Sequence, residues 1–275
     1  MAREMTSEEV KCCSLEILSY IDCVCKANNL RYYLCAGTLL GAIRHHGFIP
    51  WDDDIDIMMP RNDYEKLFSI MNDTGSYAAL NGANTKNFPY AFGKIVDNRT
   101  IKKEPIRYSC QVIGVDIDVF PLDNFPDSEK ESLTFLKEIE HCQRLVSRRI
   151  SAYKIEPSLN KTITRNCKIF VNRLAEFFGS PDINDVVSEF SVLAQRYNTQ
   201  STCHCGISTL YHYGMGERYR KLIFDGTVYV SFEGKDYPAP SGYDEYLTGM
   251  YGSDYMQSPP LEKRRTHHFY KAYWK

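Results

Sequence analysis

The chain has 275 residues, which is enough for one large domain or two small ones with a substantial hydrophobic core. Hydrophobic residues make up 43% and charged residues 25%, and these ordinary values exclude collagen-like, low-complexity and coiled-coil proteins. The formal net charge is −2. A protein that coats nucleic acid usually carries a large basic excess, so we expect no nucleic-acid partner.

The sequence contains no segment that predicts membrane insertion or export. No run approaches the roughly 18 apolar residues of a spanning helix, and residues 1–5 lead into acidic residues instead of an apolar signal core. We therefore expect a cytoplasmic protein, in which the ten cysteines are free thiols. Neither Cys23 with Cys25 nor the Cys-His-Cys stretch at 203–205 has the spacing of a tetrahedral zinc site, so ordinary packing is favoured there.

The first part of the chain predicts a helix, a strand and a second helix. The residues from Thr6 to Glu9 form a capping box, and apolar residues follow at helical spacing, which predicts an amphipathic helix over 6–28. The aromatic and apolar residues 32–35 predict a strand. Gly37 and Thr38 then predict a tight turn that opens a short helix.

Alternating and helical patterns continue through the first half. Residues 55–59 alternate as a strand that stops at Pro60, and a helix is predicted over 62–71. Further strands are predicted over 92–96 and 112–120.

The middle of the chain is helical, and its end returns to short strands. Helices are predicted over 128–149, 161–178 and 183–197. Strands are predicted over 207–210 and 228–232, with a helix starting near residue 241. With a boundary near Pro126, these patterns divide the chain into a catalytic core (1–126), a helical subdomain (127–200) and a C-terminal segment that completes the pocket (201–275).

The most informative segment is Pro-Trp-Asp-Asp-Asp-Ile-Asp at residues 50–56. Its carboxylates are bordered by the apolar residues of a buried strand, which is unusual for a solvated loop. Side chains two apart leave the same face of a strand, so Asp54 and Asp56 should project together with Cα atoms about 7 Å apart. Two ionised carboxylates at that distance repel each other unless a cation lies between them. The pattern therefore predicts a divalent metal site.

Oxygen ligands select Mg²⁺ or Mn²⁺, which usually leave coordination positions for phosphate and water. This favours phosphoryl transfer. The strand around Asp116 and Asp118 carries two more acids on one face. We place Asp118 first, and Asp116 second, as a third metal ligand or as the base for an attacking hydroxyl.

Phosphate binding is predicted just upstream of this acidic pair. A small turn that opens a helix exposes unpaired N–H groups and the positive end of the helix dipole, so Gly37 and Thr38 are candidate phosphate-binding residues. Arg44 and Arg61 are candidates for neutralising the phosphates.

At this point the sequence resembles the LicD-type phosphocholine transferases, which share a domain with fukutin and fukutin-related protein. The resemblance covers roughly residues 30–268. The Asp-Val-Phe-Pro-Leu-Asp run at 118–123 looks like the family's Asp-Ile-Phe-Pro-Leu-Asp motif, which favours Asp118 over Asp116. Other matching stretches are 36–41, 49–56, 61–64, 232–234, 238–240, 251–252, 259–260 and 263–268.

The resemblance implies an α/β (α+β) fold, with a nucleotidyltransferase-like mixed sheet, flanking helices and an inserted helical subdomain. It implies transfer of a phospho-alcohol from a CDP-activated donor, in the namesake branch CDP-choline, to a hydroxyl of a cell-surface glycan or lipid-linked sugar. By resemblance Asp54, Asp56 and Asp118 are catalytic and hold the metal. The donor-binding residues that we predict are Gly37, Thr38, Arg44, Asp53, Arg61 and Glu233.

The same resemblance leaves the alcohol open between choline, ribitol and glycerol. It implies that the region of Tyr243 helps Glu233 to close the donor pocket. The chain looks like the compact bacterial type, without the stem and membrane anchor of the eukaryotic members. An aromatic cage would suit a quaternary ammonium group, and its candidate residues are Trp51, Tyr90, Phe92, Tyr211 and Tyr213.

Two other functions are compatible with the residues themselves. An NTP-dependent nucleotidyltransferase acting on a small molecule or antibiotic would use the same turn and acidic pair but would release pyrophosphate. A glycan-binding module without catalysis would suit the 20 Tyr and 14 Phe, although the acidic residues argue against it.

A weaker hypothesis concerns the C-terminal tail. Its basic and aromatic residues favour peripheral contact with the inner face of an anionic membrane, and the alternative is docking on the helical subdomain. These residues are Lys263, Arg264, Arg265, Phe269, Tyr270, Lys271, Tyr273 and Trp274.

Overall fold

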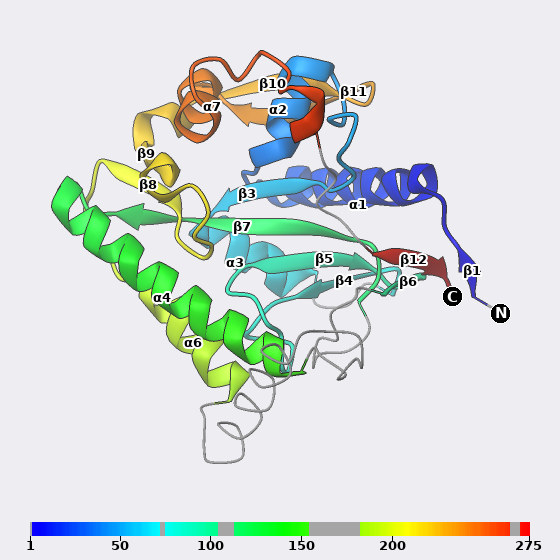
Figure 1. The fold of residues 1–275 in the computed structure, drawn as a ribbon, viewed down its shortest axis with the longest axis horizontal. Helices are drawn as coiled ribbons and strands as arrows, with labels where there is room; N and C mark the ends of the chain where they lie inside the picture. Colours follow the sequence, from blue (N-terminus) through cyan, green and yellow to red (C-terminus); the bar gives the residue numbers. More distant parts are fainter. Residues whose placement is uncertain (1, 72–74, 104–112, 154–181, 265–269) are drawn as a thin grey trace.

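A mixed β-sheet forms the centre of the protein, as the computed structural model shows (Figure 1). The structure describes residues 2–71, 75–103, 113–153, 182–264 and 270–275. The main path of the sheet runs β2-β3-β7-β5-β4, and β8 and β9 extend it from β7. The strands are β2 (Tyr33–Leu34), β3 (Asp56–Pro60), β7 (Asp116–Phe125), β5 (Gly93–Asp97), β4 (Tyr77–Leu80), β8 (His204–Ile207) and β9 (Arg218–Arg220).

The long strand β7 organises this sheet. It pairs in parallel with β3 on one side, and on its other side it pairs antiparallel first with β5 and then with β8. Three segments that are far apart in the sequence therefore meet along one strand. The first and last parts of the chain share this sheet, and the proposed division into three segments stays a prediction.

Helices cover the sheet and build the part above it (Figure 1). α1 and α3 contact the central strands, whereas α2 and α7 lie above β3 beside the hairpin of β10 and β11. The helices are α1 (Ser7–Asn28), α2 (Ala36–His45), α3 (Arg61–Ile70), α4 (Glu129–Tyr153), α6 (Ile183–Ala194) and α7 (Tyr243–Tyr251). The hairpin strands are β10 (Thr227–Phe232) and β11 (Lys235–Pro240).

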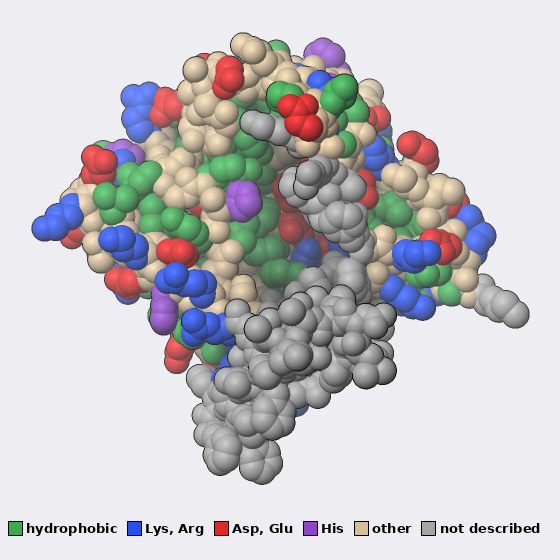
Figure 2. Space-filling model, in the orientation of Figure 1, with side chains coloured by type: hydrophobic (Ala, Val, Ile, Leu, Met, Phe, Trp, Pro, Cys, Tyr) green, Lys and Arg blue, Asp and Glu red, His purple; other side chains and the backbone are tan. Residues whose placement is uncertain are grey.

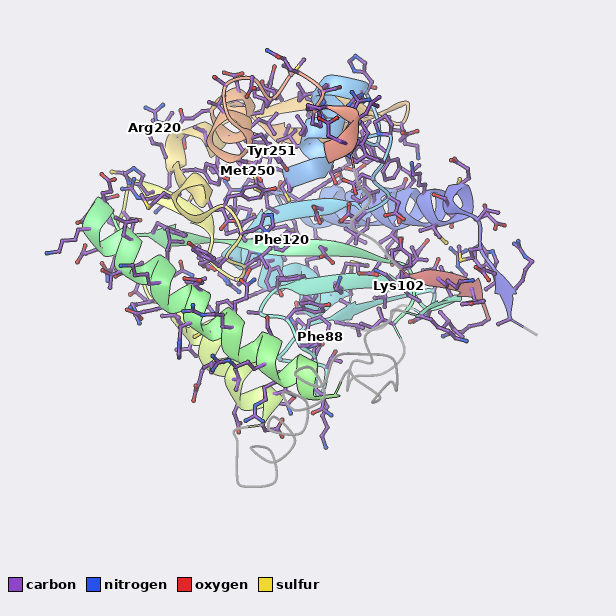
Figure 3. The ribbon with its side chains drawn as sticks, in the orientation of Figure 1. Phe88, Lys102, Phe120, Arg220, Met250 and Tyr251 are labelled. Carbon is purple, nitrogen blue, oxygen red and sulfur yellow. The ribbon has the colours of Figure 1, made fainter. Side chains whose placement is uncertain are left out.

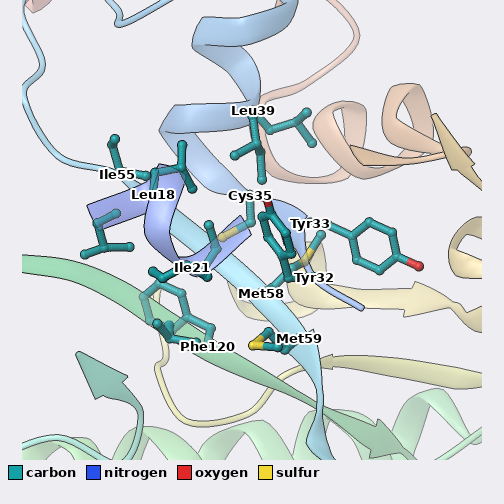
Figure 4. Packing of buried hydrophobic residues seen from close by; sticks show 14 of the residues in the cluster. Leu18, Ile21, Tyr32, Tyr33, Cys35, Leu39, Ile55, Met58, Met59 and Phe120 are labelled. Atoms are coloured by element: carbon teal, nitrogen blue, oxygen red, sulfur yellow. The ribbon is translucent and has the colours of Figure 1, made fainter. Parts of the chain in front are cut away.

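The main hydrophobic core lies where α1 and α2 meet the strands (Figure 4). Leu18 and Ile21 of α1 pack on the same cluster as Met58 of β3 and Phe120 of β7. Their spacing explains the elements, because Ile17, Leu18 and Ile21 return to one face of a helix. A second cluster joins α4 to α6 beside the far end of β7.

Most of the predicted elements are confirmed. The Thr6 capping box starts α1, with Thr6 and Glu9 each bonded to the other's backbone. The mixed sheet with its helices confirms the predicted α+β class. The helix expected over 161–178 lies outside the described residues.

Two local predictions are wrong in detail. The turn before α2 has its left-handed residue at Ala36, with φ 45°, and Gly37 already lies in the first helical turn. The strand expected over 207–210 is β8, which lies earlier in the chain, at His204–Ile207. Its pairing with β7 begins at His204 and ends at Ile207. The short strands β1 (Arg3–Glu4), β4, β6 (Thr100–Lys103), β9, β11 and β12 (Lys271–Trp274) were not predicted.

The C-terminal tail is part of a small second sheet. β12 lies between β1 and β6 and pairs antiparallel with both. Residues 271–274 of the tail therefore dock on these two strands, because their backbone completes the hydrogen bonding of both. Residues 265–269 of the tail lie outside the described part. Within the described ranges, every helix is too short or too polar to span a bilayer.

Candidate active site

The predicted acids meet at the centre of the sheet. Asp56 and Asp118 are directly paired across the parallel strands β3 and β7, whose spacing is about 4.8 Å. Asp54 lies just before β3. All three line one cavity of about 700 Å³, and we call them the acidic floor. In Figure 2 the surface is hollowed between the upper part of the molecule and the strands, with acidic and hydrophobic side chains inside the hollow.

The backbone at Asp56 is held from both sides. Its N–H donates to Thr38 Oγ1 at 2.8 Å, and its carbonyl accepts from Cys35 N at 3.1 Å. Asp118 N donates to the carbonyl of Ile55 at 3.1 Å. The start of α2 and the strand β7 therefore fix the position from which Asp56 projects.

Asp116 and Asp118 have different surroundings, which separates the two candidates for the third acid. Lys94 of β5 contacts both carboxylates, at 2.5 Å from Asp116 and closely at Asp118. Lys102 adds a second ammonium group at 2.7 Å from Asp116. The side chain of Asp116 is 3% exposed and that of Asp118 is 24% exposed. Asp116 is therefore engaged by two lysines, whereas Asp118 reaches the cavity.

The pKa values follow from this arrangement. Burial raises the pKa of Asp56 well above its usual range, and the neighbouring Asp54 and Asp118 raise it further. Burial also raises the pKa of Asp118, although Lys94 opposes this. For Asp116 burial acts in the same direction, but Lys102 and Lys94 outweigh it and hold its pKa below the usual range. The acidic floor is thus a place where negative charge is not fully compensated.

The donor chemistry of the acidic floor fits a hard divalent cation. Carboxylate oxygens are the ligands that Mg²⁺ and Mn²⁺ prefer, and a cation would relieve the repulsion that raises the pKa of Asp56. Among the described residues, no group of three or more His, Cys, Asp or Glu side chains is arranged as a ready ligand set. The metal therefore stays a prediction that rests on residue type and on shared position.

Gly37 and Arg44 line the same cavity. A Cβ at Gly37 would lie 3.1 Å from an Asp52 carboxylate oxygen, so the absence of a side chain keeps the start of α2 close to the acidic segment. The Arg44 guanidinium donates to the carbonyls of Tyr255 at 2.8 Å and Gln257 at 3.2 Å. It therefore holds the segment that forms the opposite rim.

The other predicted donor-binding residues lie outside the lining of this cavity. Thr38 is buried beneath Asp56, and Arg61 forms a bidentate ion pair with Asp123, with bonds of 2.7 and 2.5 Å. Glu233 accepts from Phe48 N at 3.0 Å, and Asp53 accepts from the Tyr270 hydroxyl at 3.2 Å. Arg61 instead lines a separate cavity of about 500 Å³ beside α3 and α6.

Aromatic residues are spread differently from the predicted cage. Trp51 and Tyr213 line the acidic cavity together with Phe120, Tyr251 and Tyr255. Tyr90 and Phe92 instead face the ammonium group of Lys94, at 5.1 and 5.8 Å from their ring centroids. The part of α7 that reaches the cavity is Met250 and Tyr251, at the end opposite to Tyr243.

Lys94 and Glu217 are among the ionisable residues of this site that sequence reasoning missed. Lys94 is a single lysine within a strand of apolar residues, a signal that could have indicated a buried acidic partner. Glu217 lies in the short 3-10 helix η1 (Gly214–Glu217) and lines the cavity, although its local sequence carries no recognisable signal.

The comparisons with known proteins identify the family of the chain. Residues 29–147 match the family model described as LicD/FKTN/FKRP, nucleotidyltransferase domain. The chain is 31% identical over 276 residues to the lipopolysaccharide cholinephosphotransferase LicD of Haemophilus influenzae. The aligned region covers 98% of this chain and 99% of that protein. It is 34% identical over 84 residues to the human ribitol 5-phosphate transferase FKRP. This aligned region covers 30% of this chain and 14% of FKRP. The resemblance seen in the sequence is therefore confirmed, and the chain belongs to the LicD family.

Proposed function

We propose that this protein transfers a phospho-alcohol, with phosphocholine from CDP-choline as the first choice, to a hydroxyl group of a cell-surface glycan precursor. CMP is the second product. The observation that carries the proposal is the pairing of Asp56 with Asp118 across β3 and β7, with Asp54 on the same cavity. The similarity to LicD along nearly the whole chain supports the choice of reaction.

The transfer breaks one bond and forms one. The acceptor oxygen attacks the phosphorus that bears the alcohol, and the bond from that phosphorus to the oxygen shared with CMP breaks. The proton of the hydroxyl goes to Asp118, whose carboxylate reaches the cavity while Lys94 holds it in place. A bound Mg²⁺ or Mn²⁺ would neutralise the diphosphate and the charge that develops on the leaving CMP.

The start of α2 is suited to the diphosphate. Gly37 lies in the first turn of a ten-residue helix and lines the cavity, so backbone N–H groups and the positive end of the helix dipole are available there. Arg44 at the other end of α2 adds positive charge to the rim.

The acceptor and the place of reaction follow from the proposed chemistry. LicD and FKRP are named for transfer to lipopolysaccharide and for transfer of ribitol 5-phosphate. We propose a glycan or lipid-linked sugar as acceptor, a cytoplasmic location for the reaction, and contact with the inner face of the membrane when that acceptor is lipid-linked.

Product analysis tests the proposal. The purified protein is incubated with Mg²⁺, a glycan acceptor and either CDP-choline, CDP-ribitol, CDP-glycerol or a nucleoside triphosphate. We expect CMP and a phospho-alcohol on the acceptor, with CDP-choline used best. Pyrophosphate release from a triphosphate would instead identify a nucleotidyltransferase. Asp236→Asn, an exposed change on β11, is the matched control for variants of the acidic floor.

A further inference from the structure

Glu217 is a buried carboxyl group that the proposed reaction does not use. It ends η1 and is only 3% exposed, yet it lines the cavity of the acidic floor. Its Oε2 is buried and has no hydrogen-bond partner in the described part of the chain. Burying such a group is costly unless a donor or a positive charge compensates it. The position of Glu217 thus indicates a ligand group on this side of the cavity.

Two tyrosines accompany this carboxyl group in the lining of the cavity. Tyr213 and Tyr251 line the same cavity, and their ring centroids are 5.5 Å apart in an edge-to-face arrangement. Their side chains are hydrogen-bonded to each other. Figure 3 shows Met250 and Tyr251 at the end of α7, above Phe120 of β7. We call Tyr213, Glu217 and Tyr251 the aromatic wall, which faces the strands that carry the acidic floor.

The aromatic wall and the acidic floor are close enough to interact. The Tyr213 hydroxyl experiences the charges of both Glu217 and Asp56. A donor whose diphosphate lies over the acidic floor would therefore place its alcohol beside the aromatic wall. This neighbourhood makes the wall a candidate for recognising the group that is transferred.

The charges of the lining favour a cationic group. The acids of the lining are Asp52, Asp54, Asp56, Asp118, Glu217 and Asp254, and its strong base is Arg44. A quaternary ammonium group cannot donate a conventional hydrogen bond, and ring faces with a nearby carboxylate are the protein groups that attract it. A neutral polyol also supplies a hydrogen bond to such an oxygen, so the excess of acids over bases in the lining is what favours a cation.

We propose that Glu217, together with Tyr213 and Tyr251, forms the subsite for the quaternary ammonium group of the transferred alcohol. This inference rests on the proposed function and assigns donor choice to a residue outside the acidic floor. Burial raises the pKa of Glu217 to about 8, and a bound cation would offset that cost by stabilising the charged carboxylate.

The experiment compares wild type with Glu217→Gln, which removes the charge and keeps the shape. Steady-state rates are measured with CDP-choline, CDP-ribitol and CDP-glycerol. For CDP-choline we expect KM to rise about tenfold or more while kcat changes less than about threefold. The KM values for the two uncharged donors should change less than the KM for CDP-choline. Glu189→Gln, exposed on α6, is the matched control.

A binding measurement gives a readout that does not need turnover. Calorimetry compares CDP-choline with CDP on both proteins, and tetramethylammonium serves as a probe of the cation subsite alone. We expect the preference of wild type for CDP-choline over CDP to fall about tenfold in Glu217→Gln. Glu217→Asp, which keeps the charge on a shorter side chain, should retain part of this preference.

The outcomes separate the inference from the proposed function. If CDP-choline is turned over equally well by wild type and Glu217→Gln, the subsite is overturned and the function stands. If wild type prefers CDP-ribitol or CDP-glycerol, the proposal of a quaternary ammonium subsite is wrong, whereas the proposal of phospho-alcohol transfer stands. If no CDP donor releases CMP, the proposed function fails, and tetramethylammonium binding that depends on Glu217 still supports the cation site. Binding that is equal in both proteins overturns the cation site.

Discussion

The acidic floor and the aromatic wall face each other across one cavity but arise in different ways. The floor combines Asp56 and Asp118, which are paired across β3 and β7, with Asp54, which lies two residues before Asp56 and just ahead of β3. The wall joins a 3-10 helix to the end of α7, more than thirty residues later. In the proposed function, the floor serves the transfer and the wall serves the choice of donor.

Removal of divalent metal tests the floor most severely. We expect EDTA to abolish CMP release, and added Mg²⁺ or Mn²⁺ to restore it, because diphosphate binding beside several carboxylates requires a compensating cation. Thermal unfolding with and without EDTA controls for loss of the fold. Full activity in the presence of the chelator would contradict the role assigned to Asp54 and Asp56.

Asp56→Asn should lower kcat by about a thousandfold or more, since it removes a charge from the reacting centre. Its free energy of unfolding should not fall, because burial and neighbouring acids already raise the pKa of Asp56 in the folded state. Rates and chemical denaturation measured on the same preparation check both expectations, with Asp236→Asn as control. If Asp56→Asn had wild-type activity at saturating Mg²⁺, the assignment of Asp56 to the active site would be wrong.

Lys94→Met probes how the floor is supported. Lys94 lies between Asp116 and Asp118 with little exposure, so its loss leaves buried acids with less compensation. We expect the free energy of unfolding to fall by about 3 kcal/mol, as for other broken buried ion pairs. Denaturant titration measures this. A variant as stable as wild type would show that Lys102 alone satisfies Asp116.

The stability of Glu217→Gln relative to wild type should depend on pH. In the unliganded protein the pKa of Glu217 is raised from 4.5 to about 8 by burial. Below pH 4.5 both folded and unfolded states hold the proton. As the pH rises toward 8 the unfolded chain ionises first, so wild type loses stability that the Gln variant keeps. We expect the variant to be more stable by a few kcal/mol near pH 8 and nearly equal near pH 4.

Denaturant titrations of both proteins across this pH range provide the measurement. A difference in stability that does not change with pH would show that Glu217 is not held in its neutral form. Glu189→Gln is again the control, because its carboxyl group is exposed.

Tyr270→Phe gives the smallest expected effect. The change removes the hydroxyl that donates to Asp53 at 3.2 Å and leaves the ring against Lys102. We expect a loss of about 1 kcal/mol in stability, typical of one hydrogen bond. Donor KM should rise about twofold, because Asp53 adjoins the floor. Unchanged unfolding and donor titrations would show that the Tyr270 hydroxyl supports neither stability nor donor binding.

Individual residues show how far sequence reasoning reached. The capping box at Thr6 and the alternation after Ile55 are local signals, and the structure confirms the helix and the strand that they predicted. Arg61 was a phosphate candidate, but the structure pairs it with Asp123, which follows from the register of β7 and from no local pattern. Short strands such as β12 escaped prediction because their partners lie at the other end of the chain.

The sequence by itself determined the family and the class of fold, because the family motifs and the spacing of apolar residues in helices and strands are local patterns along the chain. The tertiary structure placed Asp118 on the cavity and Asp116 against Lys94 and Lys102, since only the packing of β5 and β6 brings these lysines to Asp116. It also revealed Glu217, whose meaning comes from burial and from an unpaired oxygen. Burial depends on what the rest of the chain places around a residue, and no local pattern encodes it.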